Sequence, residues 1–478
     1  MYLFAGLRGY SGPLLAVFVA GIVFCSSFIG FSSVPLTTAS LSDSDSTDSS
    51  TVPLLLWNYT TSSRAHSTII DQGILYFTPA DDRVYALNAA RGTTLWTAGY
   101  SRAYPVVDDG TLFVNDNRRM YALDGRSGER IWENHVSPGG GDHFMAKPVI
   151  ANDILYVCLE SGLRALDATT GDMLWQYVGP MYVVTSPLVV DDVVYVGSYN
   201  TVYAFDAQRN HKIWSYTVGY KPWDPDSFVS SFVVDDEIIY FCAGNGNAYA
   251  LNAGSGYEIW RYTYTSTMPK WRIPRAPFLS DGLIYVVSDT GDVCALNASD
   301  GTKLWSSVIG KDRLSVPFLS DGLIYVVSDT GDVCALNASD GTKLWSSVIG
   351  EGALSVPAFY EGVLYFGSDD GNLYALNATS GLELWNYQIS SPISLDPSSW
   401  RIGGVGLPVV CDGVLFVVGG EGVFALAVSS SFVLPSLPFY LPSSLVLLIV
   451  EVVAVVVVVV CCVWLYLFKK RNRLKTSL

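Results

Sequence analysis

The 478-residue sequence contains no Cys-x-x-Cys pair, so it lacks the spacing that zinc sites and dithiol redox motifs use. Three of its eight cysteines, Cys25, Cys461 and Cys462, lie in apolar segments near the chain ends. The other five occur singly, inside or beside strand-like apolar runs. We interpret these five as buried thiols that behave as small hydrophobic side chains; they are Cys158, Cys242, Cys294, Cys334 and Cys411.

Basic residues are also scarce, with 28 Lys and Arg against 44 Asp and Glu and a net charge of −16. Five of the cations fall in the last ten residues, so the rest of the chain carries a net charge of −21. A body this acidic would repel a phosphate backbone, which excludes nucleic acid as a partner. Turn chemistry accounts for most of the acidity, because many Asp occur in Asp-Gly and Asp-Asp turns.

The sequence is rich instead in one repeated motif, Ala-Leu-Asn/Asp-x-x-x-Gly-x-x-Leu/Ile-Trp, seen in residues 375–385 as ALNATSGLELW. One of the eight copies has Phe205 in place of the Leu and Asn210 in place of the Gly. The copies end at Trp96, Trp132, Trp175, Trp214, Trp260, Trp305, Trp345 and Trp385. A ninth, unattached Trp57 lies near the start of the repeat region.

The residue types of the motif predict a hairpin that packs against a neighbour. Its apolar ends are strand-like and its polar centre is turn-like. Gly supplies a positive φ in the turn, and Asn210 is expected to tolerate the same conformation. Ala leaves room for a large side chain. A Trp that recurs once per unit is expected to pack one unit against the next, with its N–H bonded to a carbonyl.

Each Trp strand follows three other short apolar runs, and the Trp residues are spaced 36 to 46 residues apart. A repeated unit of four antiparallel strands with short turns predicts a β-propeller blade. A proline begins the first strand of seven units, and proline is tolerated at a strand start or at an unpaired edge. We therefore expect the first strand inside and the Trp strand outside; the prolines are Pro105, Pro148, Pro187, Pro277, Pro317, Pro357 and Pro408.

The two ends of the repeat region complement each other. The last unit, residues 407–428, has three strand patterns and no Trp strand, whereas residues 54–59 supply a Trp strand alone. Pairing them would complete one blade and remove two free sheet edges. We predict an all-β propeller that is closed by its N-terminal strand.

Two consecutive units are copies of each other, because residues 277–310 and 317–350 are identical over 34 positions. The pair indicates a recent duplication or an error in the assembly of the sequence. Nine units are counted when both copies are included. We predict a propeller of the eight-bladed type with one extra unit.

The terminal segments predict a membrane-anchored protein. Residues 445–468 are long and apolar enough to span a bilayer, and the basic cluster that follows predicts a cytoplasmic C-terminus and an extracytoplasmic propeller. Whether the N-terminal segment is cleaved decides between a single-pass and a two-pass protein. The expected order is signal sequence or N-terminal anchor (1–34), Ser/Thr/Asp-rich spacer (35–53), propeller (54–428), linker (429–444), transmembrane helix (445–468) and basic tail (469–478).

The motif resembles the tryptophan-docking motif of PQQ-like (quinoprotein-type) propellers, over about residues 54–428. This family includes quinoprotein dehydrogenases and non-enzymatic scaffolds similar to BamB. The resemblance implies that an enzyme would use PQQ and calcium, with a vicinal disulfide over the cofactor. The only adjacent pair, Cys461-Cys462, lies in the expected membrane helix, no C-x-x-C-H is present, and no insertion could carry the usual active-site loops. We expect no enzymatic activity, no catalytic residue, and no cofactor or metal site.

Four long loops interrupt the repeat, at residues 137–147, 217–230, 263–276 and 388–406. All are crossovers between blades, and crossovers share one face of a propeller. Their Trp and Arg side chains are of the type that anchors interfaces, although they could instead cap blade ends or plug the channel. The candidate partner-binding residues are Tyr220, Trp223, Asp224, Trp271, Arg272, Trp400 and Arg401.

These observations predict a membrane-anchored, extracytoplasmic propeller that acts as a non-catalytic binding or scaffold module at the cell envelope, with a protein or glycan partner. A PQQ-dependent quinoprotein oxidoreductase is the first alternative. A structural surface or adhesion protein, which would self-associate, is the second.

Overall fold

The computed structural model describes residues 53–428, apart from gaps at 64, 101–103, 117, 137–142, 145, 180–184, 220–227, 265–273, 289, 311–313, 316, 329, 351, 391–407 and 421. The two apolar terminal segments, 14–31 and 445–468, lie outside these residues. The part of the chain that is described contains no helix with the length and hydropathy needed to cross a bilayer.

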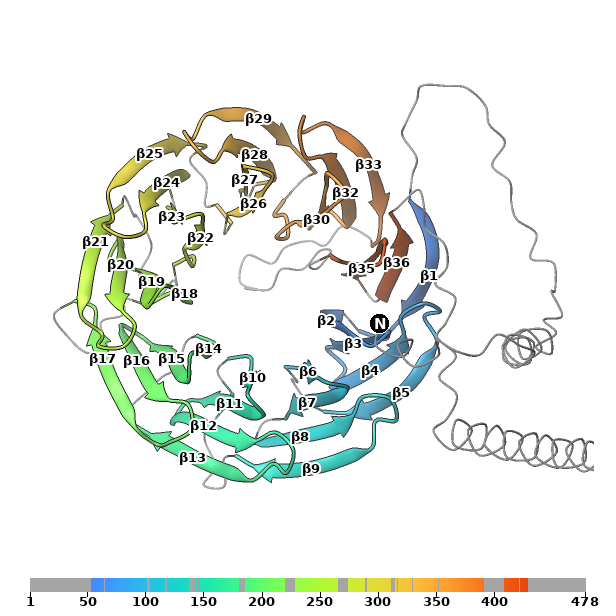
Figure 1. The fold of residues 1–478 in the computed structure, drawn as a ribbon. Coiled ribbons are helices and arrows are strands. Elements are labelled where there is room, and N and C mark those ends of the chain that lie inside the picture. Colours follow the sequence, from blue (N-terminus) through green and yellow to red (C-terminus); the bar gives the residue numbers. More distant parts are fainter. Residues whose placement is uncertain are drawn as a thin grey trace, which may run out of the picture. The chain divides into compact units, whose positions relative to one another are not determined.

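The described residues form nine four-stranded antiparallel sheets arranged as a ring of blades (Figure 1). The first strand of each blade faces the central channel, and the Trp strand lies on the circumference, which confirms the expected order (Figure 1). In seven blades the first strand begins directly after a proline. The expectation of an eight-bladed type is wrong, because both duplicated units form complete blades of their own.

Within each blade the strands are given from the inside of the ring to the outside. The first three blades are β2 (Ala65–Asp71), β3 (Ile74–Pro79), β4 (Arg83–Asn88) and β5 (Thr94–Gly99); β6 (Val106–Asp108), β7 (Thr111–Asn115), β8 (Arg119–Asp124) and β9 (Arg130–His135); and β10 (Val149–Ala151), β11 (Ile154–Leu159), β12 (Gly162–Asp167) and β13 (Met173–Val178).

The next three blades are β14 (Leu188–Val190), β15 (Val193–Ser198), β16 (Thr201–Asp206) and β17 (Lys212–Thr217); β18 (Val233–Asp235), β19 (Ile238–Ala243), β20 (Asn247–Asn252) and β21 (Glu258–Thr263); and β22 (Phe278–Ser280), β23 (Leu283–Val287), β24 (Asp292–Asn297) and β25 (Lys303–Val308). The last three are β26 (Phe318–Ser320), β27 (Leu323–Val327), β28 (Asp332–Asn337) and β29 (Lys343–Val348); β30 (Ala358–Tyr360), β31 (Val363–Gly367), β32 (Asn372–Asn377) and β33 (Glu383–Gln388); and β34 (Val409–Cys411), β35 (Val414–Gly419), β36 (Gly422–Ala427) and β1 (Leu54–Thr60).

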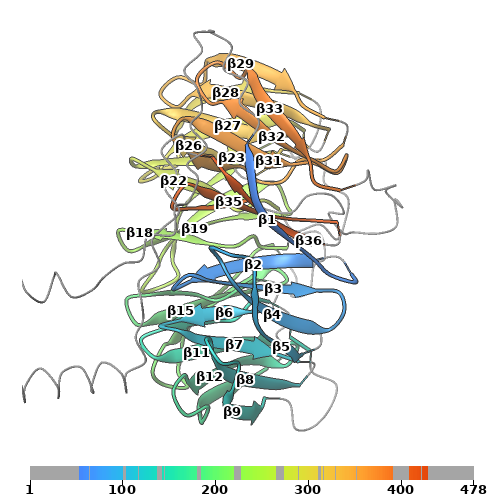
Figure 2. The same cartoon turned by 90° about the vertical axis from the view of Figure 1, so that its right-hand side faces the viewer.

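The closing blade combines both ends of the repeat region, as predicted. Its strand order is β1-β36-β35-β34, so the first strand of the chain supplies the outermost strand beside β36 (Figure 2). The pairing is antiparallel, with Leu54 opposite Ala427 and Trp57 opposite Ala425. Both chain ends of the ring are thereby held in one sheet.

The nine Trp residues of the motif lie between neighbouring blades. Each is the cross-strand partner of the motif Ala in its own blade, as Trp214 is of Ala204. Eight of them donate an indole hydrogen bond of 2.7 to 3.1 Å to a backbone carbonyl of the next blade. The ninth, Trp385, packs in the cluster between the β30–β33 blade and the closing blade.

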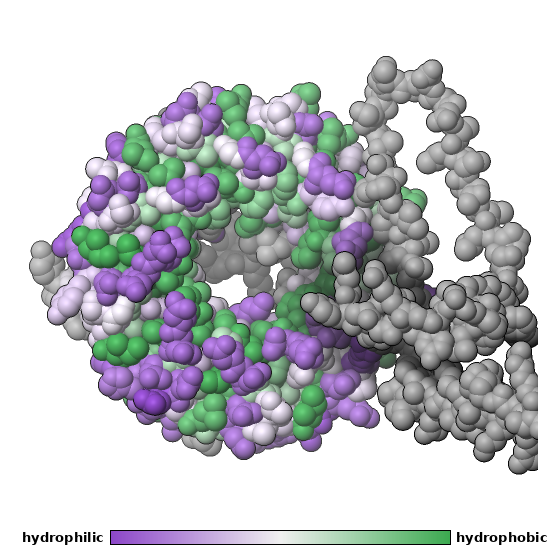
Figure 3. All heavy atoms as spheres, viewed as in Figure 1, coloured by the Kyte–Doolittle hydropathy of each residue, from purple (hydrophilic) through white to green (hydrophobic). Residues whose placement is uncertain are grey.

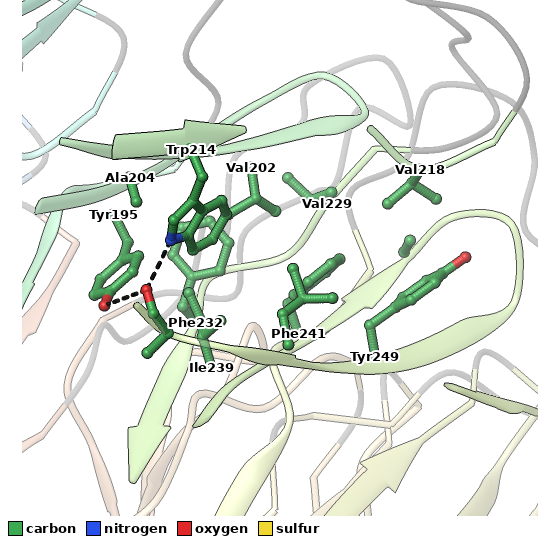
Figure 4. Packing of buried hydrophobic residues seen from close by; sticks show 13 residues of the cluster. Tyr195, Val202, Ala204, Trp214, Val218, Val229, Phe232, Ile239, Phe241 and Tyr249 are labelled. Carbon is green, nitrogen blue, oxygen red and sulfur yellow. Dashed lines mark hydrogen bonds between the residues drawn. The ribbon is translucent and has the colours of Figure 1, made fainter. Parts of the chain in front are cut away.

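The Tyr side chains of the second strands are a part of this contact that sequence reasoning missed. Trp214 and Tyr195 both donate to the carbonyl of Ala253, at 2.7 and 3.2 Å (Figure 4). The same pairing of donors occurs at the carbonyls of Ala207, Ala298, Ala338 and Ala378. The recurring Tyr nine or ten residues before the motif Ala was the available signal. The hydrophobic core is therefore a series of clusters between blades, such as the one around Trp214 and Phe241.

The motif Gly is required by packing as well as by backbone conformation. In seven blades the Gly has a φ of +66 to +77°, and a Cβ atom on it would lie 2.3 to 2.6 Å from the indole ring of the preceding blade. The expectation that Asn210 adopts the same positive φ is wrong. At the equivalent position of the other seven blades, a Cβ atom would meet the indole ring of the preceding blade. The turn takes another shape, in which the His211 N–H donates to the Arg209 carbonyl at 2.7 Å.

We expect Gly256→Ala to destabilise the protein far more than Gly282→Ala. The two glycines have nearly the same φ, +71 and +72°, but a Cβ on Gly256 would lie 2.6 Å from Trp214, whereas Gly282 faces open space. Both changes carry the cost of a positive φ, about 1 kcal/mol, and overpacking adds about 1–3 kcal/mol at Gly256 alone. Thermal unfolding midpoints of the two variants measure the difference. Equal midpoints would contradict the packing role of the glycine.

Candidate partner-binding face

The alternating strand directions give the ring two unlike faces. One, the short-turn face, carries the turns between first and second strands and between third and fourth strands. The other, the crossover face, carries the turns between second and third strands and the crossovers between blades. Figure 3 shows the ring as spheres, with hydrophilic and hydrophobic side chains interspersed around the channel opening.

All four long loops belong to the crossover face. The candidate partner-binding side chains lie outside the described residues; they are Tyr220, Trp223, Asp224, Trp271, Arg272, Trp400 and Arg401. What the structure defines is the rim from which these loops start and to which they return. That rim consists of the turns between second and third strands and the entries to the inner strands.

Buried hydroxyl groups fix the ends of several crossovers. The Thr185 Oγ1 atom accepts the Gly197 N–H at 2.8 Å, and Ser355 Oγ accepts the Gly367 N–H at 3.0 Å. Ser230 and Ser315 accept the N–H groups of Cys242 and Val327 in the same way, at 2.9 and 3.2 Å. These four side chains are buried. Each hydroxyl satisfies a strand N–H that would otherwise be unpaired, so the crossovers enter the inner strands at fixed points. Sequence reasoning missed this role, whose signal in three of the four cases is a Ser or Thr two residues before a strand-opening proline, as in Thr185 and Pro187.

Hydrogen bonds from Tyr phenols to Asp carboxylates stabilise three turns between second and third strands on the crossover face. Tyr85 donates to Asp81, Tyr121 to Asp116 and Tyr374 to Asp370, each at 2.7 Å. Burial and the hydrogen bond to Asp81 together raise the pKa of Tyr85 to about 12. The phenols are therefore protonated at neutral pH and serve as hydrogen-bond donors rather than as bases or nucleophiles.

The buried Tyr side chains between blades predict a loss of stability at alkaline pH. Burial, assisted by nearby carboxylates, raises the pKa of Tyr76, Tyr156, Tyr195 and Tyr240 to about 12. An unfolded Tyr titrates near 10, so the stabilisation is complete below about pH 10 and is lost as the pH rises to about 12. We expect cooperative unfolding in this window, followed by circular dichroism and phenolate absorbance. Phenolate formation near pH 10 with the fold intact would contradict the prediction.

Within the described residues, no group of three or more His, Cys, Asp or Glu side chains is arranged to hold a metal ion. The five cysteines in this part of the chain are separate thiols, so no vicinal disulfide occurs among them. Burial raises the pKa of Cys158 and that of Cys242, which leaves both as neutral thiols. Cys461 and Cys462 lie outside the described residues.

Comparisons with known proteins agree with this fold. The family model described as "Outer membrane protein assembly factor BamB" matches residues 54–102, 80–273 and 244–434. Among curated relatives, a tetrathionate hydrolase of Acidithiobacillus ferrooxidans is 29% identical over 98 residues, covering 20% of this chain and 19% of that protein. BamB of Moranella endobia is 27% identical over 124 residues, covering 22% and 32%. The alignments thus span less than a third of each curated relative.

Solved structures with the same fold include a BamB protein and two dehydrogenases. BamB from Moraxella catarrhalis superposes with a TM-score of 0.51 at 16% identity, covering 78% of this chain and 99% of that one. A europium-containing methanol dehydrogenase gives 0.53 at 15%, covering 77% and 85%, and the quinohemoprotein alcohol dehydrogenase of Comamonas testosteroni gives 0.52 at 14%, covering 80% and 77%. At these identities the likeness shows the fold alone. On the family match and the nine docked tryptophans, the chain belongs to the BamB-type family of PQQ-like β-propellers.

Proposed function

We propose that this protein is a membrane-anchored, extracytoplasmic propeller that acts as a non-catalytic binding scaffold at the cell envelope. One observation carries the proposal: every crossover, including the four long ones, starts from and returns to the same face of the ring. Repeat proteins bind with the face on which their insertions gather. The family match to an assembly factor supports a protein partner.

The test compares crosslinked partners of two matched variants in the native host. One carries Trp223→Ala, Trp271→Ala and Trp400→Ala on the crossover face. The other carries Tyr257→Ala and Leu382→Ala, which remove side chains that are 77% and 68% exposed on the short-turn face. We expect a partner that is lost from the first variant and retained by the second. Retention of every partner by a correctly folded crossover variant would refute the proposal.

A quinoprotein oxidoreductase is the second candidate, favoured by the similarity to two dehydrogenase folds. If the chain is such an enzyme, PQQ and calcium added to the purified protein should produce quinone absorbance and dye-linked alcohol oxidation. A surface or adhesion role predicts self-association in sedimentation experiments, which the crossover variant would abolish. Either result would replace the scaffold proposal.

A further inference from the structure

Both ends of the propeller leave from the same face. β1 runs antiparallel to β36 with Leu54 opposite Ala427, so the chain enters β1 and leaves β36 at the same edge of the closing blade (Figure 2). The Val428 N–H donates to the Gly413 carbonyl, at 3.0 Å, in the turn between β34 and β35. That turn belongs to the short-turn face. The segments that precede residue 53 and follow residue 428 therefore start from this face.

We infer that the short-turn face is turned toward the membrane and that the crossover face is presented away from it. The inference rests on the proposed anchor at residues 445–468. It further specifies the partner site: the partner approaches from outside the bilayer and does not have to insert between the propeller and the lipid. An uncleaved N-terminal anchor would favour the same orientation, because it would attach the chain to the membrane through Leu54 at the same edge of the blade.

The negative charge of the short-turn face opposes this orientation on anionic lipid, whereas the linker to the membrane helix favours it. The distance over which the repulsion acts decides between these two effects. Eight of the nine turns between first and second strands carry Asp or Glu and none of the nine carries Lys or Arg, so anionic lipid would repel this part of the short-turn face. The proposed linker of sixteen residues, 429–444, is long enough to hold the propeller up to about 55 Å from the membrane. The Debye length is about 8 Å at physiological ionic strength, so repulsion over that distance is largely screened. The attachment of the linker to the short-turn face therefore sets the orientation of the propeller, except at low salt on anionic lipid.

Cys411 provides a natural probe, because it is exposed at the end of β34 on the short-turn face whereas the other four described cysteines are buried. The full chain with Cys25→Ala, Cys461→Ala and Cys462→Ala is labelled at Cys411 and reconstituted in phosphatidylcholine vesicles that contain a headgroup acceptor dye. The matched probe combines Cys411→Ser with Asp82→Cys, an exposed position in the β3–β4 turn of the crossover face. Energy transfer reports the height of each label above the lipid.

We expect the label at 411 to lie about 20 Å closer to the lipid than the label at 82, the length of a six-residue strand. Added phosphatidylserine should lower transfer from position 411 at low salt, and high salt should restore it. Equal heights, or a greater height at 411, in a chain that floats with the vesicles would overturn the orientation and leave the scaffold proposal standing. A chain that does not float with the vesicles would refute the anchor, and the orientation with it.

Discussion

Deletion of residues 277–316 is expected to yield a folded propeller with one blade fewer. The deletion removes β22–β25 and places Trp260 against the β26–β29 blade. The cluster that Trp260 now occupies includes Ile284, Val286, Cys294, Leu296 and Ala298. In the duplicate these positions are Ile324, Val326, Cys334, Leu336 and Ala338, the same residues in the same order.

The hydrogen bond and the close glycine contact have equivalents as well. Trp260 donates to Ala298 and packs over Gly301, while Trp305 does the same with Ala338 and Gly341. Repeat stability is approximately a sum of units and nearest-neighbour interfaces. One interface is lost with the deleted blade and the other eight are kept or reproduced by the same residues, so the main change is in the curvature of the ring. We expect a thermal midpoint within about 5 °C of the parent and eight blades by electron microscopy.

The control for this deletion removes residues 277–297, which leaves β25 without its blade. That variant should aggregate, because it exposes unpaired strand edges. Aggregation of the 40-residue deletion as well would show that ring geometry, and not interface identity, fixes the number of blades.

Trp57→Ala is expected to produce the second large effect, by weakening the closure of the ring. Trp57 donates to the Ala89 carbonyl at 2.9 Å, and its ring covers Gly92 of the neighbouring blade. It packs against Phe416 of β35, with ring centroids 6.0 Å apart. Replacing a large aromatic side chain in such a contact costs about 3–5 kcal/mol.

The loss of Trp57 is expected to have a larger effect than the loss of another docked Trp, because the strand that carries Trp57 closes the ring. β1 has no covalent link to β36, so a weakened β1 can leave and expose the edge of β36. We expect faster proteolysis near Thr60 and a lower unfolding midpoint than for Trp260→Ala, which lies inside a continuous blade. Leu54→Ala, at a side chain that is 67% exposed in the same strand, is the control and should behave as the parent. Equal proteolysis of the Trp57 and Trp260 variants would refute the special role of β1.

The sequence alone determined the blade, its strand order and the closure of the ring. These follow from short-range patterns: the Ala-to-Trp hairpin, the prolines before the inner strands, and the unattached Trp57 beside a unit without a Trp strand. Each pattern depends on residues within one unit or on a count of units. Such information is present in the chain before it folds.

The tertiary structure decided what depends on contacts between units. The double donation of Tyr195 and Trp214 to one carbonyl, and the absence of space for a Cβ on the motif Gly, both involve the next blade. The missing space also explains why Asn210 does not imitate glycine. The number of blades required the structure for the same reason, because a duplicated unit with matching interfaces forms another blade. The common face of both chain ends followed from the register of β1 on β36, which joins residues that are far apart in the sequence.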